Sequence, residues 1–146
     1  MSWIRVWIHL VFSTKNRIPY LDSQSLRFKV FEHIKENAKE KDIWLDCVGG
    51  YADHIHCLVS LGTTQTISNT AKLIKGESSF WINKNQLVKG KFYWQDDFWA
   101  VGVSESHVKA VRNYIHQQEE KHGTIPFSLE IDEFMKKYNW KIIKGS

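Results

Sequence analysis

Apolar side chains recur along the first forty residues with two different periods. Residues 3–13 (WIRVWIHLVFS) are rich in Trp, Ile and Val and partly alternate with polar residues, which is typical of a strand. Residues 14–22 are basic and turn-like, and the stretch that follows, 23–41, has a helical period. Its apolar positions are Leu26, Val30, Phe31, Ile34 and Ala38. Asp22 or Ser23 is suited to be the N-cap of this helix.

The middle of the chain predicts a hairpin followed by a second helix. Residues 43–50 and 53–61 have the apolar content of strands. The Gly49-Gly50 pair at the end of the first strand predicts the break at which the chain turns back. Residues 66–83 then return to a helical period.

The last third of the chain predicts two short strands and a long helix. The strands are expected at residues 92–94 and 98–101, where aromatic residues cluster. The helix is expected to begin after Ser104, which is suited to be its N-cap, and to run to Gly123, a natural C′ residue. Residues 124–146 form a C-terminal tail without a clear period.

The predicted order of elements is β-α-β-β-α-β(β)-α. This order indicates an α+β fold with a ferredoxin-like or RRM-like antiparallel sheet, helices on one face, and a final helix at the C-terminal end. The second face of the sheet is expected to be free for a site. We assign residues 1–123 to one functional domain and treat residues 124–146 as a tail of the same domain.

Composition and charge narrow the class of protein. With 146 residues the chain is long enough for one core and too short for two domains. The formal net charge of +4 favours a polyanionic partner such as nucleic acid, although similar charge also serves solubility. Cys47 and Cys57 lie in apolar surroundings without zinc-site spacing, so we expect two reduced thiols. No stretch has the length of a membrane span or a signal-peptide pattern, and we expect a soluble cytoplasmic protein.

Two histidines on the strand at 53–61 are candidate metal ligands. Because side chains alternate along a strand, His54 and His56 point to the same face, opposite the apolar Ile55, Cys57 and Val59. Paired imidazoles can hold a divalent metal ion. The Asp53 carboxylate can orient a metal-bound imidazole by accepting a hydrogen bond from its other ring nitrogen. An alternative is that both histidines are ordinary surface residues of a half-exposed strand.

A tyrosine and a glutamine on the last predicted helix complete the candidate site. Tyr114 and Gln118 are four residues apart, so they share one face of a helix. Together with the histidines they would supply a metal, a third metal ligand and a phenolic nucleophile, which suffice to cut a nucleic-acid strand through a phosphotyrosine. The alternative for Tyr114 is a core aromatic whose hydroxyl is hydrogen-bonded.

Four segments of the chain resemble one family. The segments LVFSTKNRIPYL, DHIHCLVSL, KLIKGESS and VRNYIHQQEEKHG resemble the single-tyrosine HUH transposases of the smallest bacterial and archaeal insertion sequences, which include the REP-associated tyrosine transposases. The resemblance covers roughly residues 3–122. It implies that His54, His56 and Gln118 hold the metal and that Tyr114 is the nucleophile. It also implies DNA contacts from four further residues, Lys15, Arg17, Lys75 and Ser78.

The resemblance carries a set of functional expectations. It implies a transposase that cleaves and rejoins single-stranded DNA beside hairpins through a 5′-phosphotyrosine, with Mg²⁺ or Mn²⁺ as the metal. It also implies a homodimer with shared active sites, although the REP-associated relatives act as monomers. Candidate stacking residues for single-stranded DNA are Tyr93, Trp94, Phe98 and Trp99. Two alternatives stay open: a nucleic-acid-binding protein without chemistry, and a domesticated REP-type nickase.

Overall fold

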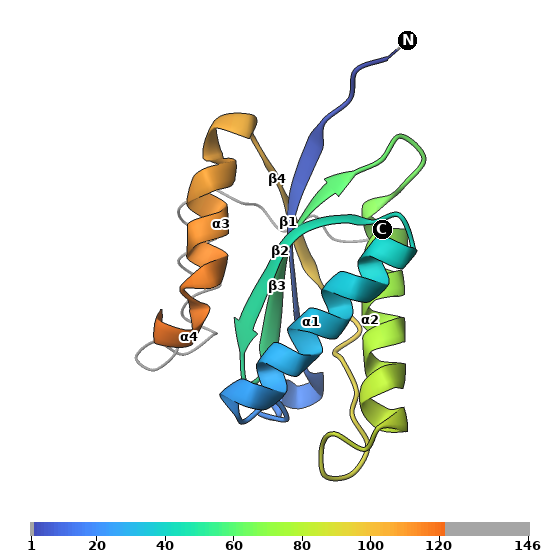
Figure 1. The fold of residues 1–146 in the computed structure, drawn as a ribbon, viewed down its shortest axis with the longest axis vertical. Coiled ribbons are helices and arrows are strands. Elements are labelled where there is room, and N and C mark those ends of the chain that lie inside the picture. Colours follow the sequence, from blue (N-terminus) through green and yellow to red (C-terminus); the bar gives the residue numbers. More distant parts are fainter. Residues whose placement is uncertain (1, 122–146) are drawn as a thin grey trace.

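A computed structural model describes residues 2–121 and contains one antiparallel sheet with helices on both of its faces (Figure 1). The strand order is β2-β3-β1-β4, and each neighbouring pair is antiparallel. The strands are β1 (Val6–Ser13), β2 (Trp44–Tyr51), β3 (His54–Leu61) and β4 (Trp99–Val103). The longer helices are α1 (Gln24–Glu40), α2 (Ile67–Lys84) and α3 (Val108–His116). This arrangement confirms the expected α+β fold.

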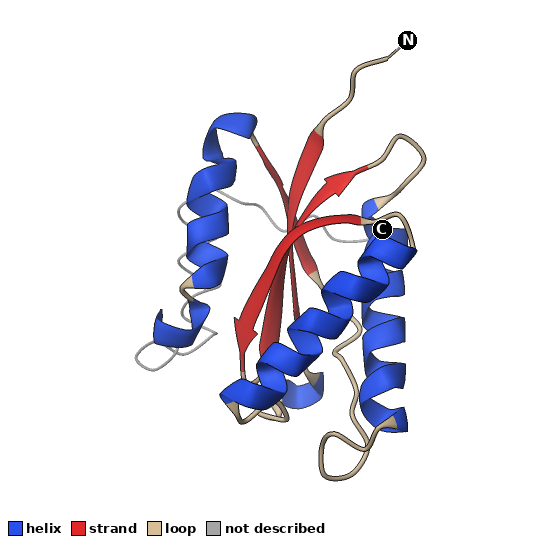
Figure 2. Cartoon of the chain, in the orientation of Figure 1, coloured by secondary structure: helices blue, strands red, loops and turns tan. Residues whose placement is uncertain are grey.

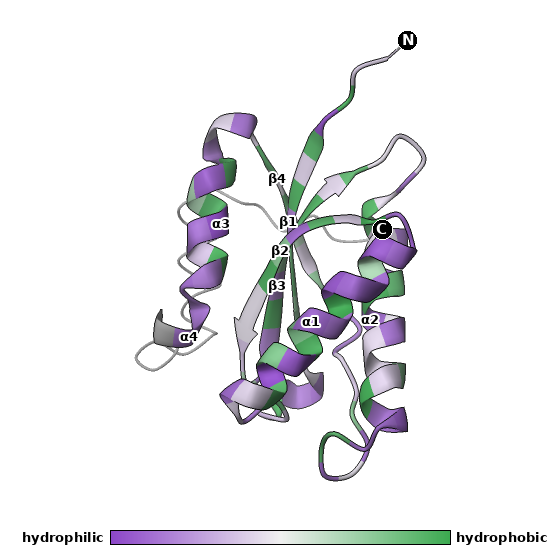
Figure 3. Ribbon diagram, viewed as in Figure 1, coloured by the Kyte–Doolittle hydropathy of each residue, from purple (hydrophilic) through white to green (hydrophobic). Residues whose placement is uncertain are grey.

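The larger hydrophobic core lies between the sheet and the pair α1 and α2. Alternate residues of β1 and β3 supply the sheet side of this core: Ile8, Leu10, Phe12, Ile55, Cys57 and Val59. The helices bury one side and expose the other, so hydrophobic and hydrophilic positions alternate along them in Figure 3. Both predicted helix starts are confirmed, because Ser23 caps α1 by accepting from the Leu26 amide and Thr66 caps α2 by accepting from the Asn69 amide.

A second, smaller core lies under α3 on the opposite face. It contains Trp7, Cys47, Leu58, Val108, Val111 and Ile115. The expectation of an open second face is therefore wrong, because α3 covers part of it (Figure 1). Both cysteines are free buried thiols, and burial raises the pKa of Cys47 to about 12 and that of Cys57 further. The expected reduced thiols agree with this environment.

The Gly49-Gly50 pair does not break the chain. Both glycines lie inside β2, and the turn falls at residues 52–53. A Cβ on Gly49 would lie 2.4 Å from the Ile115 carbonyl oxygen of α3. Gly49 is thus required by the close approach of a helix rather than by a turn.

Three further predictions about the elements are corrected. The first strand begins at Val6 rather than at residue 3, and residues 92–94 form only an isolated bridge between Thr14 and Trp94. The last helix is interrupted: a 3-10 turn at Glu105–His107 precedes α3, α3 ends at His116, and a short helix α4 (Gln118–Lys121) follows (Figure 2). The tail at 124–146 and the helix end at Gly123 lie outside the described residues. No helix among residues 2–121 has both the length and the apolar character needed to cross a membrane.

Candidate functional site

The predicted histidine pair lies in the interior of the molecule. His54 and His56 occupy β3 on the face that α3 covers, and each is 0 % exposed. The alternative of two surface histidines is therefore wrong. A fully buried imidazole needs defined polar neighbours, because burial of an unsatisfied polar group costs about 1–3 kcal/mol.

Both ring nitrogens of His54 have a polar side chain within hydrogen-bond distance. Asp53 Oδ1 lies 2.8 Å from His54 Nδ1, so a carboxylate acceptor keeps the proton on Nδ1 and leaves a lone pair on Nε2. Gln118 Oε1 lies 3.2 Å from that Nε2. The amide orientation is fixed because Gln118 Nε2 donates to the Tyr114 carbonyl oxygen at 3.3 Å. His54 Nε2 and Gln118 Oε1 are thus within hydrogen-bond distance of each other, and both are atom types that can bind a divalent metal ion.

The spacing of these atoms suits a divalent metal. Two donor atoms that each lie about 2.1 Å from one ion, at roughly a right angle, are about 3.0 Å apart. The 3.2 Å between His54 Nε2 and Gln118 Oε1 is close to this value. The His54 and His56 ring centroids are 5.1 Å apart, so a second imidazole lies beside this pair. Among residues 2–121 no group of three or more His, Cys, Asp and Glu side chains could hold a metal, so the candidate set depends on the Gln118 amide oxygen.

A third histidine belongs to this cluster and was not predicted. His9 of β1 is 2 % exposed, and its Nε2 lies 2.9 Å from His56 Nδ1. Burial lowers the pKa of His9 to about 4, so its ring is neutral near pH 7. This contact fixes the orientation of the His56 ring and makes Nε2 the nitrogen through which His56 would bind a metal. The sequence signal was a histidine at an inward position of β1, between Trp7 and Val11.

Tyr114 lies on α3 beside the histidine cluster. Its ring centroid is 5.6 Å from that of His56 and 6.1 Å from that of His9. The ring also packs against the smaller core, and the hydroxyl oxygen is shielded from solvent. The structure therefore brings His54, His56, Gln118 and Tyr114 together within one chain.

The predicted basic loop forms an exposed patch at the end of β1. Lys15 and Arg17 lie in a 3-10 turn at Lys15–Arg17 and are exposed. Lys15 Nζ lies 5.3 Å and Lys91 Nζ 5.2 Å from the centroid of the Tyr93 ring, which is 44 % exposed. We call Lys15, Arg17, Lys91 and Tyr93 the basic-aromatic patch. Cations around an exposed ring provide both charge and a stacking surface for a single strand.

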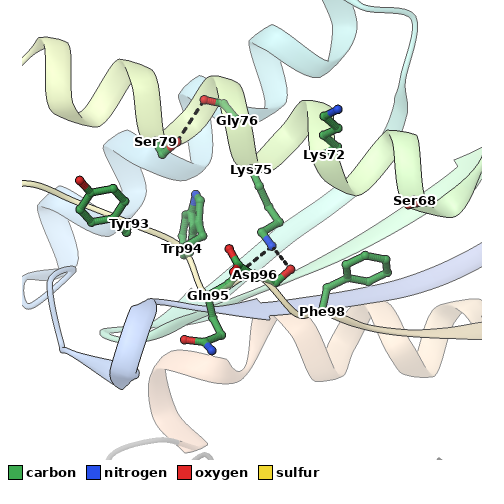
Figure 4. Close-up of a pocket in the computed structure, with 10 residues that line it drawn as sticks. All are labelled: Ser68, Lys72, Lys75, Gly76, Ser79, Tyr93, Trp94, Gln95, Asp96 and Phe98. Carbon is green, nitrogen blue, oxygen red and sulfur yellow. Dashed lines mark hydrogen bonds between the residues drawn. The ribbon is translucent and has the colours of Figure 1, made fainter. Parts of the chain in front are cut away.

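A cavity of about 380 Å³ adjoins this patch (Figure 4). Lys72, Lys75, Tyr93 and Phe98 are among the residues that line it. Lys75 Nζ donates to the carbonyl oxygens of residues 95 and 96, at 2.6 and 2.8 Å, so it fixes the loop before β4.

Ser78 and Trp94, two of the expected DNA contacts, lie inside the protein. Ser78 is 1 % exposed; its hydroxyl donates to the Ile74 carbonyl oxygen and accepts from Trp94 Nε1. Trp94 is itself only 7 % exposed and packs in the larger core. Ser78 is not placed to touch DNA in this structure, whereas Tyr93, Trp94 and Phe98 line the cavity.

Comparisons with known proteins are consistent with this geometry. Residues 2–118 match the family model described as "Transposase IS200 like". The curated proteins contain no match. A solved protein from Deinococcus radiodurans R1, described as a transposase, is 20% identical with a TM-score of 0.64, and the match covers 80% of this chain and 93% of that one.

A second solved structure shows a REP-associated tyrosine transposase bound to a REP hairpin. It is 17% identical with a TM-score of 0.62, and the match covers 86% of this chain and 73% of that one. At these identities the likeness to both structures shows the fold alone.

Proposed function

The chain belongs to the IS200-like transposase family, and from this premise we propose that it cleaves and rejoins single-stranded DNA beside hairpins through a 5′-phosphotyrosine at Tyr114. The observation that carries the proposal is the meeting of His54 Nε2 and Gln118 Oε1 at 3.2 Å, beside His56 and Tyr114, in a buried site. An imidazole nitrogen and an amide oxygen that meet in this way, next to a second imidazole, form a donor set that a divalent cation can use.

The proposed reaction exchanges one phosphodiester for another. Tyr114 Oη forms a bond to the scissile phosphorus, the bond from phosphorus to the 3′ oxygen breaks, the phenol loses its proton and the 3′ oxygen gains one. Mg²⁺ or Mn²⁺ held by His54, His56 and Gln118 would neutralise negative charge that develops on the phosphate oxygens. A later attack by another 3′ hydroxyl on the phosphotyrosine joins the new ends, so no ATP is required.

Residues around the ligands keep them in place. Asp53 holds the His54 ring by its Nδ1, and His9 holds the His56 ring by its Nδ1. Such partners fix the tautomer and the direction of the metal-binding nitrogen. Positioning of this kind provides most of what phosphoryl transfer demands from a protein.

The DNA would reach the site from the basic-aromatic patch. Thr14, which precedes the Lys15–Arg17 turn, donates its amide to the Asp53 carbonyl oxygen at 2.9 Å, so the patch adjoins the start of β3. The solved relative bound to a REP hairpin supports a hairpin as the recognised feature. The patch and the cavity beside it offer positive charge and aromatic faces to the unpaired nucleotides.

We keep the homodimer as part of the proposal. Strand β4 is the last strand of the sheet within residues 2–121, and an exposed edge can pair with a second copy. Sharing of active sites is a separate matter. One chain already gathers the ligands and the tyrosine, so we propose that each copy uses its own Tyr114.

Covalent capture tests the reaction directly. Wild-type protein, incubated with a single-stranded hairpin oligonucleotide and Mn²⁺ or Mg²⁺, should form an adduct that survives denaturation. Tyr114→Phe should abolish the adduct while leaving folding intact, because the ring and its packing are retained. Tyr20→Phe is the matched control, since Tyr20 packs on Phe92 in the larger core. An adduct that persists in Tyr114→Phe would contradict the proposal.

A further inference from the structure

Gln118 lies in a short helical segment that follows a break in the last helix. Helix α3 ends at His116, Gln117 leaves the helical conformation at φ −90° and ψ 5°, and the described part of α4, Gln118–Lys121, has four residues. Isolated helices shorter than about 12 residues are marginal in water. The position of Gln118 beside His54 must therefore be set by contacts of α4 with the rest of the protein.

The residue after Gln118 makes a partly buried ion pair with α1. Arg27 Nε lies 2.5 Å from Glu119 Oε1, and Arg27 Nη2 lies 2.8 Å from Glu119 Oε2. The third guanidinium nitrogen donates to the Leu21 carbonyl oxygen at 2.8 Å, and Arg27 Cζ lies 4.5 Å from the centroid of the Tyr51 ring. Arg27 is only 5 % exposed. The planar fork binds both carboxylate oxygens at once and so fixes direction as well as distance.

This ion pair connects helices on opposite faces of the sheet, at the edge of the sheet nearest the proposed metal site. Helix α1 covers one face and α3 the other, and α4 lies at the same end of the molecule as the start of α1 (Figure 1). Strand β2 is the edge strand there, and its last residue, Tyr51, pairs with His54. Arg27 thus contacts the strand partner of one ligand residue and the chain neighbour of the other.

We infer that Arg27 is a positioning residue, which through Glu119 holds the Gln118 amide oxygen against His54. The inference rests on the proposed metal site for its function and on the ion pair for its geometry. Arg27 touches neither the metal ligands nor Tyr114 with its charged group. It acts through α4, and its loss should release Gln118 while leaving the histidines in place.

The structure supplies a matched control pair. Arg112 of α3 binds Asp46 of β2 with the same forked geometry, Nε to Oδ2 at 2.7 Å and Nη2 to Oδ1 at 3.0 Å. That pair ties α3 to β2 before the break at Gln117. If forked ion pairs here matter only for general stability, Arg27 and Arg112 should not differ in their effect on the metal.

The test compares Arg27→Met, Arg27→Lys and Arg112→Met in the full chain. Mn²⁺ affinity is measured by electron paramagnetic resonance of the free ion, and folding is followed by thermal unfolding. Arg27→Met should weaken Mn²⁺ binding about 10–100-fold, the range for loss of a residue that orients a ligand, whereas Arg112→Met should change it by less than about twofold. Arg27→Lys keeps the charge but loses the fork, so it should fall between wild type and Arg27→Met.

A second readout separates this inference from the proposed metal site. The side-chain amide resonances of Gln118, assigned by NMR without metal, should shift in both Arg27 variants and stay unchanged in Arg112→Met. Wild-type protein that binds no Mn²⁺ would reject the metal site, and the amide resonances would still decide the positioning role. Unaltered Gln118 resonances, or Mn²⁺ affinity equal to wild type in folded Arg27→Lys and Arg27→Met, would overturn the inference. If Arg27→Met does not fold, Arg27→Lys alone decides.

Discussion

Replacement of Gly49 by alanine tests whether α3 must lie directly on the backbone of β2. The new Cβ would stand 2.4 Å from the Ile115 carbonyl oxygen, 3.0 Å from Ile115 Cγ2 and 3.2 Å from the Ile115 carbonyl carbon. The first contact is with backbone, which cannot rotate away as a side chain can. Helix α3 must therefore lift from the sheet, and it carries Tyr114 with it.

The expected loss of stability follows from two opposing effects. Overpacking costs about 1–3 kcal/mol, and a clash with backbone belongs at the upper end of that range. Replacing glycine inside a strand returns about 0.5–1 kcal/mol, because alanine loses less conformational entropy on folding. The net loss should be about 2 kcal/mol, which corresponds to a fall in Tm of roughly 4–8 °C for a domain near 150 residues.

Thermal and urea denaturation of Gly49→Ala measure this loss, and a covalent-capture assay follows its effect on Tyr114. Gly102→Ala in β4 is the matched control, since its Cβ would meet nothing within 4 Å. Gly76→Ala, in the interior of α2, also has open space and should raise stability by about 0.5–1 kcal/mol. A Gly49→Ala protein as stable as wild type would show that α3 does not lie where the structure places it.

Two further predictions concern DNA binding and subunit arrangement. Lys15→Ala combined with Arg17→Ala should reduce the salt dependence of hairpin binding, and the slope of log K against log salt concentration should fall by roughly 0.7 for each lost phosphate contact. Replacement of the exposed Lys29 and Lys39 on α1 should leave the slope unchanged. Equal slopes in both double variants would exclude the basic-aromatic patch as the DNA surface. A mixture of Tyr114→Phe and His56→Ala subunits should not recover cleavage, because the ligands and the tyrosine meet within one chain; recovery in confirmed heterodimers would show that the sites are shared.

The part of the site that depends on strand periodicity could be predicted from the sequence. Alternation placed His54 and His56 on one face of β3 and Ile55, Cys57 and Val59 on the other, and the structure has both sets there. The same alternation could have identified His9, whose phase in β1 is that of Trp7 and Val11. A single polar residue in an apolar strand looks like an interruption of the strand, so the pattern alone does not mark His9 as a site residue.

The part that depends on contacts between distant segments could not be predicted. Nothing in the residues after His116 marks the break at Gln117, because they include neither glycine nor proline before residue 123. Glu119 is held instead by Arg27, ninety-two positions earlier. The role of Gly49 was ambiguous for a similar reason. The sequence does not distinguish a glycine needed for the close approach of a helix from a glycine needed for a turn, because the position of the helix is not known from the sequence.

The burial of the Tyr114 hydroxyl oxygen has a kinetic consequence. An oxygen that a water molecule cannot touch cannot be reached by a phosphodiester, so in this arrangement the proposed nucleophile is closed off from substrate. Under the proposed mechanism, cleavage would proceed only from the fraction of molecules in which α3 or α4 has moved, and an open population of about 1% would slow the observed reaction about 100-fold relative to the open form. Encounters with single-stranded DNA too brief for that opening would leave the strand intact, which would restrain the proposed cleavage of unpaired DNA.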